Sequence, residues 1–344
     1  MHTQDPTPLV AQGDATPLRT LNRREFVRVL GEATVSGGLI AGAFAGYALT
    51  SAQRAEAAEA ILDRIGKVPK VKLSKRLGNI EIARIAICRD DPPELIGPCL
   101  AAGMNFIHKA GYFGRGVPPE IARLPRESFY CDTTVDNTSP GGDPNDEEAA
   151  YRQVVNELEQ TGLRYFDIMR AHFGWRSLAS FNKGDNASYR AFKRLKREGK
   201  VRYFGVSQHA APRERYETYA TMIEAQIESG LIDSMQVWFS YASTPDEIAI
   251  FEKAHNAGIA ITAMKTVMHG GGKMRSDAAK MAELKAPGMM GRACLRYVLG
   301  LKGANGGRIA DCCVSALRNF DMFEENLGAV ATRTAALDGF EVSV

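Results

Sequence analysis

Residues 103–114 read Gly103-Met104-Asn105-Phe106-Ile107-His108-Lys109-Ala110-Gly111-Tyr112-Phe113-Gly114. The apolar residues of 104–108 predict a short β-strand, and the glycines that follow predict a turn carrying His, Lys and Tyr. In α/β proteins the loops after the carboxyl ends of the strands share one edge of the sheet, and functional groups gather there. This stretch therefore predicts a strand whose carboxyl end is followed by residues of a functional site.

The same alternation of strand and helix recurs along the chain. Eight apolar runs predict strands at 83–88, 104–108, 128–135, 165–171, 201–207, 234–239, 259–264 and 308–315. Each is followed by a helix, such as Pro245–Asn256, or by a loop that bears one. A doubly wound, open sheet fits this alternation as well, but eight successive strand–helix units favour a sheet that closes into a barrel.

A β-hairpin is expected before the first of these strands. Its strands are Val71–Leu73 and Ile80–Ile82, and Gly78-Asn79 supplies the turn. The predicted fold class is thus α/β, an eight-stranded (β/α)8 TIM barrel with an N-terminal β-hairpin, over residues 70–335.

Length and composition fit one large globular domain. The chain has 344 residues, a hydrophobic content of 45%, a charged content of 24% and a formal net charge of +3. The charge is small and no basic run is interleaved with aromatic residues, so no nucleic acid is expected as a partner. The six cysteines are scattered without a Cys-x-x-Cys pair, which is typical of small core residues rather than of a zinc site.

Residues 1–60 resemble a twin-arginine export signal followed by a linker. Arg23-Arg24 precede a hydrophobic pair, and the weakly apolar run Val35–Leu49 is rich in Gly and Ala. Ala55-Glu56-Ala57 and Ala58-Glu59-Ala60 are candidate cleavage sites. The alternative is a disordered tail followed by an amphipathic helix.

The export interpretation implies further properties of the protein. The partner would be the twin-arginine export machinery, and the location would be periplasmic or otherwise extracytoplasmic. Contact with a membrane is expected only through the N-terminal segment, which would act as an anchor if it stayed uncleaved.

Three stretches resemble the aldo/keto reductases, within a similarity that spans roughly residues 71–330. They are Gly103–Gly114, Leu163–His172 and Leu195–Ser207. The third contains Gly199-Lys200-Val201-Arg202-Tyr203-Phe204-Gly205-Val206-Ser207, which is close to the family's Gly-Lys-x-Arg-x-x-Gly-Val-Ser. This resemblance implies the barrel fold and the reduction of carbonyl groups with NADPH.

The resemblance also implies a catalytic set, and the chain departs from it. The family uses a Tyr proton donor, tuned by a Lys and an Asp, and a His that orients the substrate. These positions fall on Phe113, Thr134, His108 and His172, so that only His172 keeps the family's residue type. Phenylalanine has no proton to donate, and the family mechanism requires a replacement.

Three nearby residues are candidates for that replacement. His108 offers a pKa near neutrality without much tuning, and Lys109 leaves the same strand end and supplies a positive charge. Tyr112, one residue before Phe113, is the third candidate, either as a donor or as a wall of the pocket. The predicted catalytic residues are thus His172, orienting the substrate, with His108, Lys109 or Tyr112 handling the proton.

The resemblance also implies cofactor-binding positions, and this chain keeps the family's residue types there better than at the catalytic positions. Ser207, Gln208 and Gln236 match residues that contact the nicotinamide amide. The regions that hold the pyrophosphate, the 2′-phosphate and the adenine contain Lys265, Ser315, Arg318, Glu325 and Asn326. An arginine there suits NADP(H), because a guanidinium pairs bidentately with phosphate. One departure is Cys88-Arg89, where the family usually has a glycine.

Three functional hypotheses follow. The leading one is an oxidoreductase that resembles the aldo/keto reductases, with NADP(H)-linked oxidation or reduction of a small carbonyl or alcohol substrate. The second is a metal-dependent enzyme that uses His108 and His172, joined by Asp132 or His209. The third is a non-catalytic ligand-binding barrel. The run His269-Gly270-Gly271-Gly272-Lys273 is expected to be a flexible loop, and the alternative is a loop that cradles phosphate.

Overall fold

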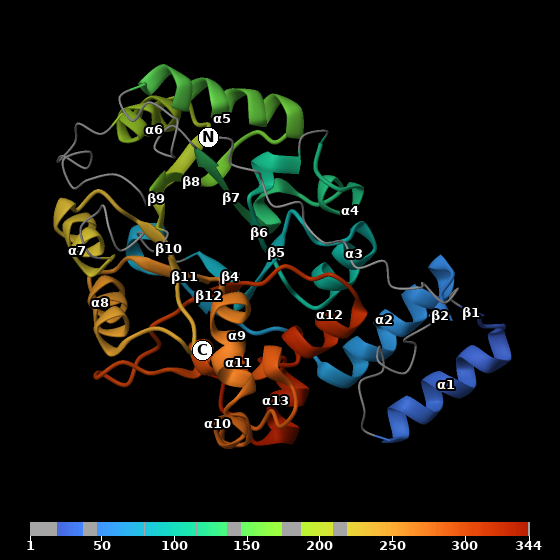
Figure 1. Cartoon of the computed structure of the whole chain (residues 1–344). Helices are drawn as coiled ribbons and strands as arrows, with labels where there is room; N and C mark the ends of the chain where they lie inside the picture. Colours follow the sequence, from blue (N-terminus) through green and yellow to red (C-terminus); the bar gives the residue numbers. More distant parts are fainter. Residues whose placement is uncertain are drawn as a thin grey trace, which may run out of the picture.

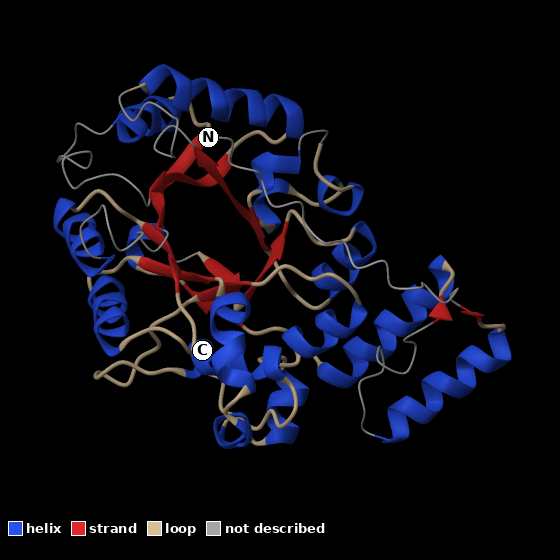
Figure 2. Ribbon diagram, in the orientation of Figure 1, coloured by secondary structure: helices blue, strands red, loops and turns tan. Residues whose placement is uncertain are grey.

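A closed barrel of eight parallel strands forms the centre of the molecule (Figures 1 and 2). The computed structural model describes residues 19–36, 47–78, 80–113, 116–135, 146–173, 187–208 and 219–342. The strands are β5 (Ile85–Cys88), β6 (Phe106–His108), β7 (Tyr130–Val135), β8 (Phe166–Phe173), β9 (Val201–Gln208), β10 (Ser234–Trp238), β11 (Ala260–Met264) and β12 (Cys312–Val314). They follow one another around the ring in sequence order, and β12 pairs with β5 to close it. The predicted (β/α)8 barrel is confirmed.

Helices surround the barrel on the outside (Figure 2). Those between successive strands are α3 (Pro93–Ala101), α4 (Pro119–Ala122), α5 (Glu147–Thr161), α6 (Ala187–Arg197), α7 (Tyr219–Ser229) and α8 (Pro245–Asn256). Three helices lie between β11 and β12, namely α9 (Thr266–Arg275), α10 (Ala278–Glu283) and α11 (Met290–Gly300), and α12 (Phe320–Leu327) and α13 (Thr332–Asp338) follow β12. Short sequence signals determine where these helices begin and end. At α8, for example, Thr244 and Glu247 form a capping box and Pro245 occupies the first turn.

The predicted hairpin closes the amino-terminal end of the barrel. Strands β3 (Lys70–Lys72) and β4 (Glu81–Ala83) are antiparallel, and a 3-10 turn, η2 (Lys75–Leu77), lies between them. The apolar residues of the hairpin form one buried cluster with Phe106, Ile168 and Cys312, which lie near the starts of their strands. This leaves the opposite end, where the strands finish, for polar groups.

The N-terminal segment packs beside the barrel (Figure 1). Helix α2 (Ser51–Ile65) contacts α3, α12 and α13, and it contains both candidate cleavage sites. Before it, α1 (Arg23–Ser36) exposes Arg23 and Arg24 but buries Phe26 in the core that also contains Ile61 of α2. Two short strands, β1 (Arg19–Thr20) and β2 (Tyr47–Ala48), flank α1 and pair in parallel.

The structure leaves the export interpretation untested. Part of the run Val35–Leu49 lies outside the described residues. Within the part of the chain that is described, no helix has the length and apolar character needed to cross a membrane. The export signal, its partner machinery and the resulting location stay predictions.

The glycine run at 269–273 is helical, so the expected flexible loop is wrong. It lies inside α9, and its glycines have a packing role. A Cβ on Gly270 would come within 2.9 Å of the Tyr241 backbone nitrogen, and one on Gly271 within 2.9 Å of the Met290 sulfur. The absence of side chains thus lets α9 lie directly against α11 and the loop after β10.

Leu77→Ala tests the role of the hairpin. Leu77 is fully buried beneath the barrel, so its truncation removes apolar contacts and leaves a cavity. We expect the free energy of unfolding to fall by about 2–5 kcal/mol. Denaturant unfolding measures the change, with Lys72→Ala on the exposed face of the same hairpin as the control. A loss as small as the control's would show that the hairpin is not part of the cooperative core.

Candidate active site

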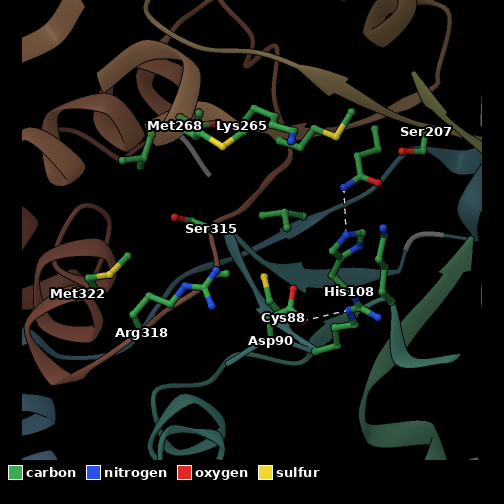
Figure 3. Close-up of a pocket in the computed structure, with 17 residues that line it drawn as sticks. Cys88, Asp90, His108, Ser207, Lys265, Met268, Ser315, Arg318 and Met322 are labelled. Atoms are coloured by element: carbon green, nitrogen blue, oxygen red, sulfur yellow. Dashed lines mark hydrogen bonds and ion pairs between the residues drawn. The ribbon is translucent and has the colours of Figure 1, made fainter. Parts of the chain in front are cut away.

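A cavity of about 420 Å³ opens at the carboxyl ends of the strands (Figure 3). It is lined by residues within β9 and β10 and by residues that end or follow β5, β6, β11 and β12. His108 lies on one side of it, and Arg318 and Met322 lie on the other, with Ser315 between them (Figure 3). The cavity therefore runs from the β6 strand end toward the segment after β12.

The buried carboxylate of Asp132 organises the His108 side of the cavity. Asp132 lies on β7, and its oxygens are 3.1 and 3.2 Å from Nδ1 of His108 on β6. The backbone N–H of Lys109 donates to the same carboxylate at 2.6 Å, and Nε of Arg170 on β8 donates to it at 2.6 Å. Hydrogen bonds to this one carboxylate on β7 thus join it to β6 and to β8.

The charge of Asp132 is compensated inside the barrel. Burial raises the pKa of its carboxyl group, but the adjacent His108 and Arg170 outweigh burial and hold the pKa below its usual range. Arg170 is itself completely buried, and its guanidinium also donates to the Ser234 hydroxyl at 3.1 Å and to the Thr262 hydroxyl at 3.4 Å. Asp132 is therefore a permanent carboxylate with a fixed orientation.

Gln236 contacts the other nitrogen of the His108 ring. Its side-chain Nε2 lies 3.2 Å from Nε2 of His108, as the dashed line in Figure 3 shows. The Asp132 carboxylate can only accept a hydrogen bond, so Nδ1 of His108 carries the proton that they share. Among the described residues, the Gln236 Oε1 atom is buried and has no hydrogen-bond partner. The neighbouring Ser207 also lines the cavity.

Basic and polar groups line the other side of the cavity. Lys265 follows β11, and Ser315 and Arg318 follow β12. Asn326 donates to the Ser315 hydroxyl at 3.1 Å, which places it directly behind the cavity wall. Glu325 instead accepts from the backbone N–H of Gly291 at 2.8 Å, at the start of α11. Glu325 therefore caps a helix in this structure.

Two lysines of the cavity have left-handed backbones. Lys109 has φ of 56° and Lys265 has φ of 60°. Side chains other than glycine, asparagine and aspartate rarely adopt this conformation, which costs on the order of 1–3 kcal/mol. Both lysines directly follow a barrel strand and line the cavity. Such strain is concentrated at functional sites, which supports a functional role for this end of the barrel.

A second buried carboxylate connects two loops beside the cavity. Asp91 accepts from the backbone N–H of Cys88 at 2.8 Å and from that of Leu317 at 2.7 Å. Burial raises the pKa of Asp91 to about 7, against the two backbone donors, which lower it. Asp91 thereby holds the loop after β5 against the loop that carries Arg318.

His172, Gln208 and Thr134 are not among the described residues that line the cavity. His172 is on β8 in register with Ser207 of β9, and Gln208 is buried and accepts from Gln226 at 2.9 Å. Thr134 is buried on β7. Tyr112 belongs to the 3-10 turn η3 (Ala110–Phe113), and the prediction for its side chain lies outside the described residues.

The structure also bears on the metal hypothesis. Within the described parts of the chain, no three His, Cys, Asp or Glu side chains are placed to hold a metal ion together. The ring nitrogens of His108 face Asp132 and Gln236. The prediction that involved His209 lies outside the described residues.

Arg170 was missed by the sequence analysis, although the sequence carries a signal for it. Ile168, Arg170 and His172 alternate along one strand, and alternate residues share a face. Ile168 belongs to the cluster at the bottom of the barrel, so Arg170 has to point into the interior above it. An arginine on an inward face requires a buried partner, which the sequence offers as Asp132 on the preceding strand.

Comparison with known proteins agrees with this architecture. The sequence matches the model of the aldo/keto reductase family over residues 87–317. The chain belongs to the aldo/keto reductase family. No curated protein matches the sequence closely enough to count as a relative.

Solved structures of similar fold include other aldo/keto reductases. A putative aldo-keto reductase from Pseudomonas aeruginosa has 16% sequence identity and a TM-score of 0.55, covering 78% of this chain and 96% of its own. An aldo-keto reductase from Bacillus halodurans in its holo form has 14% identity and a TM-score of 0.54, with 80% and 98% covered. An aldo/keto reductase from Brucella melitensis has 22% identity and a TM-score of 0.53, with 79% and 95% covered. At these identities the similarity shows the fold.

Arg170→Met tests whether this aldo/keto reductase depends on the buried ion pair. Removal of the guanidinium leaves Asp132 buried without its cationic partner, and we expect the free energy of unfolding at pH 7 to fall by about 3–5 kcal/mol. Urea unfolding measures the loss. Arg164→Met, which breaks an exposed ion pair with Glu127, is the control and should cost about 1 kcal/mol or less.

The pH dependence of the same variant supplies a second test. In the wild type the pKa of Asp132 is lowered, so its stabilisation is complete above the ordinary value of about 3.9 and is lost as the pH falls toward the folded-state pKa. In Arg170→Met one of the two groups that lower the pKa of Asp132 is lost, so this pKa is higher than in the wild type and the stability deficit should shrink as the pH falls through the acid range. A deficit that is constant from pH 3 to pH 7 would contradict this assignment.

Proposed function

We propose that the protein is an NADP(H)-linked oxidoreductase in which His108, oriented by Asp132, replaces the family's tyrosine as the proton-transferring residue. The observation that carries the proposal is the buried Asp132–His108 pair, which holds the imidazole ring at the wall of the cavity. His172 is proposed, as in the family, to orient the substrate from β8.

The residues of the cavity fit a nicotinamide dinucleotide. The carboxamide of a nicotinamide has an NH2 group to donate, and the buried Oε1 of Gln236 is an acceptor without a partner among the described residues. Ser207 adds a hydroxyl at the same place. Lys265 and Arg318 bring positive charge to the other side of the cavity, where the phosphates would lie. A bound nicotinamide supplies or accepts the hydride.

His108 carries out the proton step at its Nε2 atom. When the substrate is an alcohol, the neutral ring accepts the hydroxyl proton, and when it is a carbonyl, the protonated ring donates to the developing oxyanion. Asp132 stabilises the imidazolium and fixes the Nδ1–H tautomer.

Arg170 and the backbone of Lys109 act on this step through Asp132. Their hydrogen bonds hold the carboxylate in place on three strands. The imidazole is thus oriented by rigid secondary structure and does not need to reorganise when the proton moves.

Cofactor preference is tested with Arg318→Ala. Loss of the guanidinium should weaken the binding of NADPH by roughly 10- to 100-fold and that of NADH much less, because NADH lacks the 2′-phosphate. Quenching of protein fluorescence measures both dissociation constants, and Arg275→Ala, exposed at the end of α9, is the control. Equal losses for the two nucleotides would place Arg318 away from the 2′-phosphate.

His108→Gln tests the proton-transfer role. Removal of the imidazole should lower kcat by roughly 10²- to 10⁴-fold while leaving the dissociation constant of NADPH within a few fold of the wild type. Turnover is followed by absorbance of the reduced nicotinamide with aromatic alcohols and aldehydes. His255→Gln on α8 is the control. Full activity of His108→Gln would overturn the assignment, and binding of NADPH without turnover in the wild type would favour a binding protein.

A further inference from the structure

Asp91 joins the loop after β5 to the loop after β12. Its carboxylate accepts from the backbone N–H of Cys88 at 2.8 Å and from that of Leu317 at 2.7 Å. The backbone N–H of Asp91 donates in turn to the Cys88 carbonyl at 3.0 Å, which closes the turn after β5 and fixes the point from which the side chain extends. The paired residues of β5 and β12 end at Ala86 and Val314. Asp91 therefore continues the contact between these two segments beyond the last strand pair.

Arg318 is held between two anchored neighbours. Before it, the backbone of Leu317 donates to Asp91. After it, the side chain of Asn319 caps α12 by accepting from the backbone N–H of Met322 at 2.9 Å. The Arg318 side chain itself lines the cavity (Figure 3). Because the backbone is fixed on both sides, this arginine loses fewer conformations when its guanidinium binds an anion.

The position of Asp91 is unfavourable for an acidic residue. Its side chain is buried, and its two hydrogen-bond partners are neutral backbone groups. Burial raises the pKa to about 7 even though these donors lower it, so the carboxylate is less stable here than in water. Nearby, the charge of Asp90 also raises the pKa and that of Arg318 lowers it. Perturbed carboxyl groups of this kind are concentrated at functional sites, which supports a role beyond packing.

We propose that Asp91 is a positioning residue that determines the preference for NADPH over NADH, because it holds the loop from which Arg318 reaches the 2′-phosphate. The inference rests on the proposed function, which assigns the cavity to the dinucleotide and Arg318 to that phosphate. Asp91 is not among the described residues that line the cavity, so it acts through the backbone of Leu317. A guanidinium pairs with phosphate in a specific bidentate geometry, and its affinity therefore depends on how well it is placed.

Electrostatics alone predicts the opposite effect of Asp91. A negative charge near Arg318 weakens the attraction of the site for phosphate, and NADPH bears more negative charge than NADH. Removal of the Asp91 charge should then strengthen the binding of NADPH. If Asp91 positions Arg318, the same change weakens the binding of NADPH. The sign of the effect thus separates positioning from simple charge repulsion.

Asp91→Asn in the full-length protein tests the proposal. The amide keeps the size of the side chain, but its NH2 group faces one of the two backbone N–H donors, so one of the two hydrogen bonds is lost. We expect the dissociation constant of NADPH to rise roughly 10-fold and that of NADH to stay within about 3-fold of the wild type. Fluorescence quenching measures both constants. Binding of NADPH as tightly as in the wild type, or more tightly, would overturn the proposal.

Asp90→Asn is the matched control for the loss of charge. Asp90 directly precedes Asp91, and its carboxylate pairs with Arg89 at 3.1 Å instead of joining the two loops. This variant removes one negative charge from the same region and leaves the hydrogen bonds to Cys88 and Leu317 in place. It should therefore bind NADPH at least as tightly as the wild type does.

A double-mutant cycle with Arg318→Ala shows whether Asp91 acts through Arg318. In that background Asp91→Asn should change the dissociation constant of NADPH by less than about 2-fold, because no guanidinium is left to position. An undiminished loss there would overturn the proposal. Asp91→Glu keeps the charge but displaces the carboxylate, so it should also weaken the binding of NADPH. It takes the place of Asp91→Asn if circular dichroism shows that the amide variant is not folded.

The outcomes separate this inference from the proposed function. A preference for NADPH that is lost in Arg318→Ala but kept in Asp91→Asn overturns the role of Asp91 alone. A preference that survives Arg318→Ala overturns the assignment of both residues and keeps the oxidoreductase. A wild type that binds neither nucleotide overturns the proposed function and this inference with it.

Discussion

The arrangement of the site depends on one buried carboxylate. Asp132 has no exposed surface, and it accepts hydrogen bonds from the His108 ring, the Lys109 backbone and the Arg170 guanidinium. A buried ion pair of this kind brings little net stability, because the desolvation of both charges offsets their attraction. Its consequence is geometric. His108 at the end of β6 and the backbone of the following Lys109 are held by residues of β7 and β8, and both residues line the cavity.

The two ends of the barrel have opposite physical characters. At the amino-terminal end the hairpin adds apolar side chains to those of the strand starts, and this cluster needs no partner beyond itself. At the carboxyl-terminal end the interior residues are charged or polar and require specific partners, which Arg170 of β8 finds on β7, β10 and β11. The left-handed backbones of Lys109 and Lys265 lie at this second end, and a third lysine with this conformation, Lys285, lies between α10 and α11. The apolar packing that stabilises the barrel and the polar groups of the candidate site thus lie at opposite ends of the barrel axis.

Much of the fold could be predicted from the sequence because local signals and global pattern agree. Pro245–Asn256 is a helix with the predicted bounds, since its cap, first-turn proline and apolar spacing all indicate the same element. The helix α9 was missed because glycine has a poor intrinsic helix propensity, which close packing overrides at Gly270 and Gly271. Tertiary contact of this kind leaves no local signal.

The site was predicted in composition but not in arrangement. Seven residues at the family positions line one cavity, namely His108, Lys109, Ser207, Gln236, Lys265, Ser315 and Arg318, and their roles stay predictions. The family positions did not show that Gln208 turns toward Gln226 or that Glu325 caps α11, because those side chains are directed by neighbours distant in the sequence. Nor did they identify Arg170 as the partner of Asp132, which follows only once the inward face of β8 is known.

A crystal structure with NADP+ is the most direct test of the proposed chemistry. We expect the nicotinamide carboxamide within hydrogen-bond distance of Gln236 Oε1 and Ser207, with the ring beside His108 and the phosphates near Lys265 and Arg318. A dinucleotide bound with its nicotinamide away from Gln236 and His108, or a cavity that excludes it at saturating concentration, would contradict the assignment of His108 as the proton-transferring residue of an NADP(H)-linked enzyme.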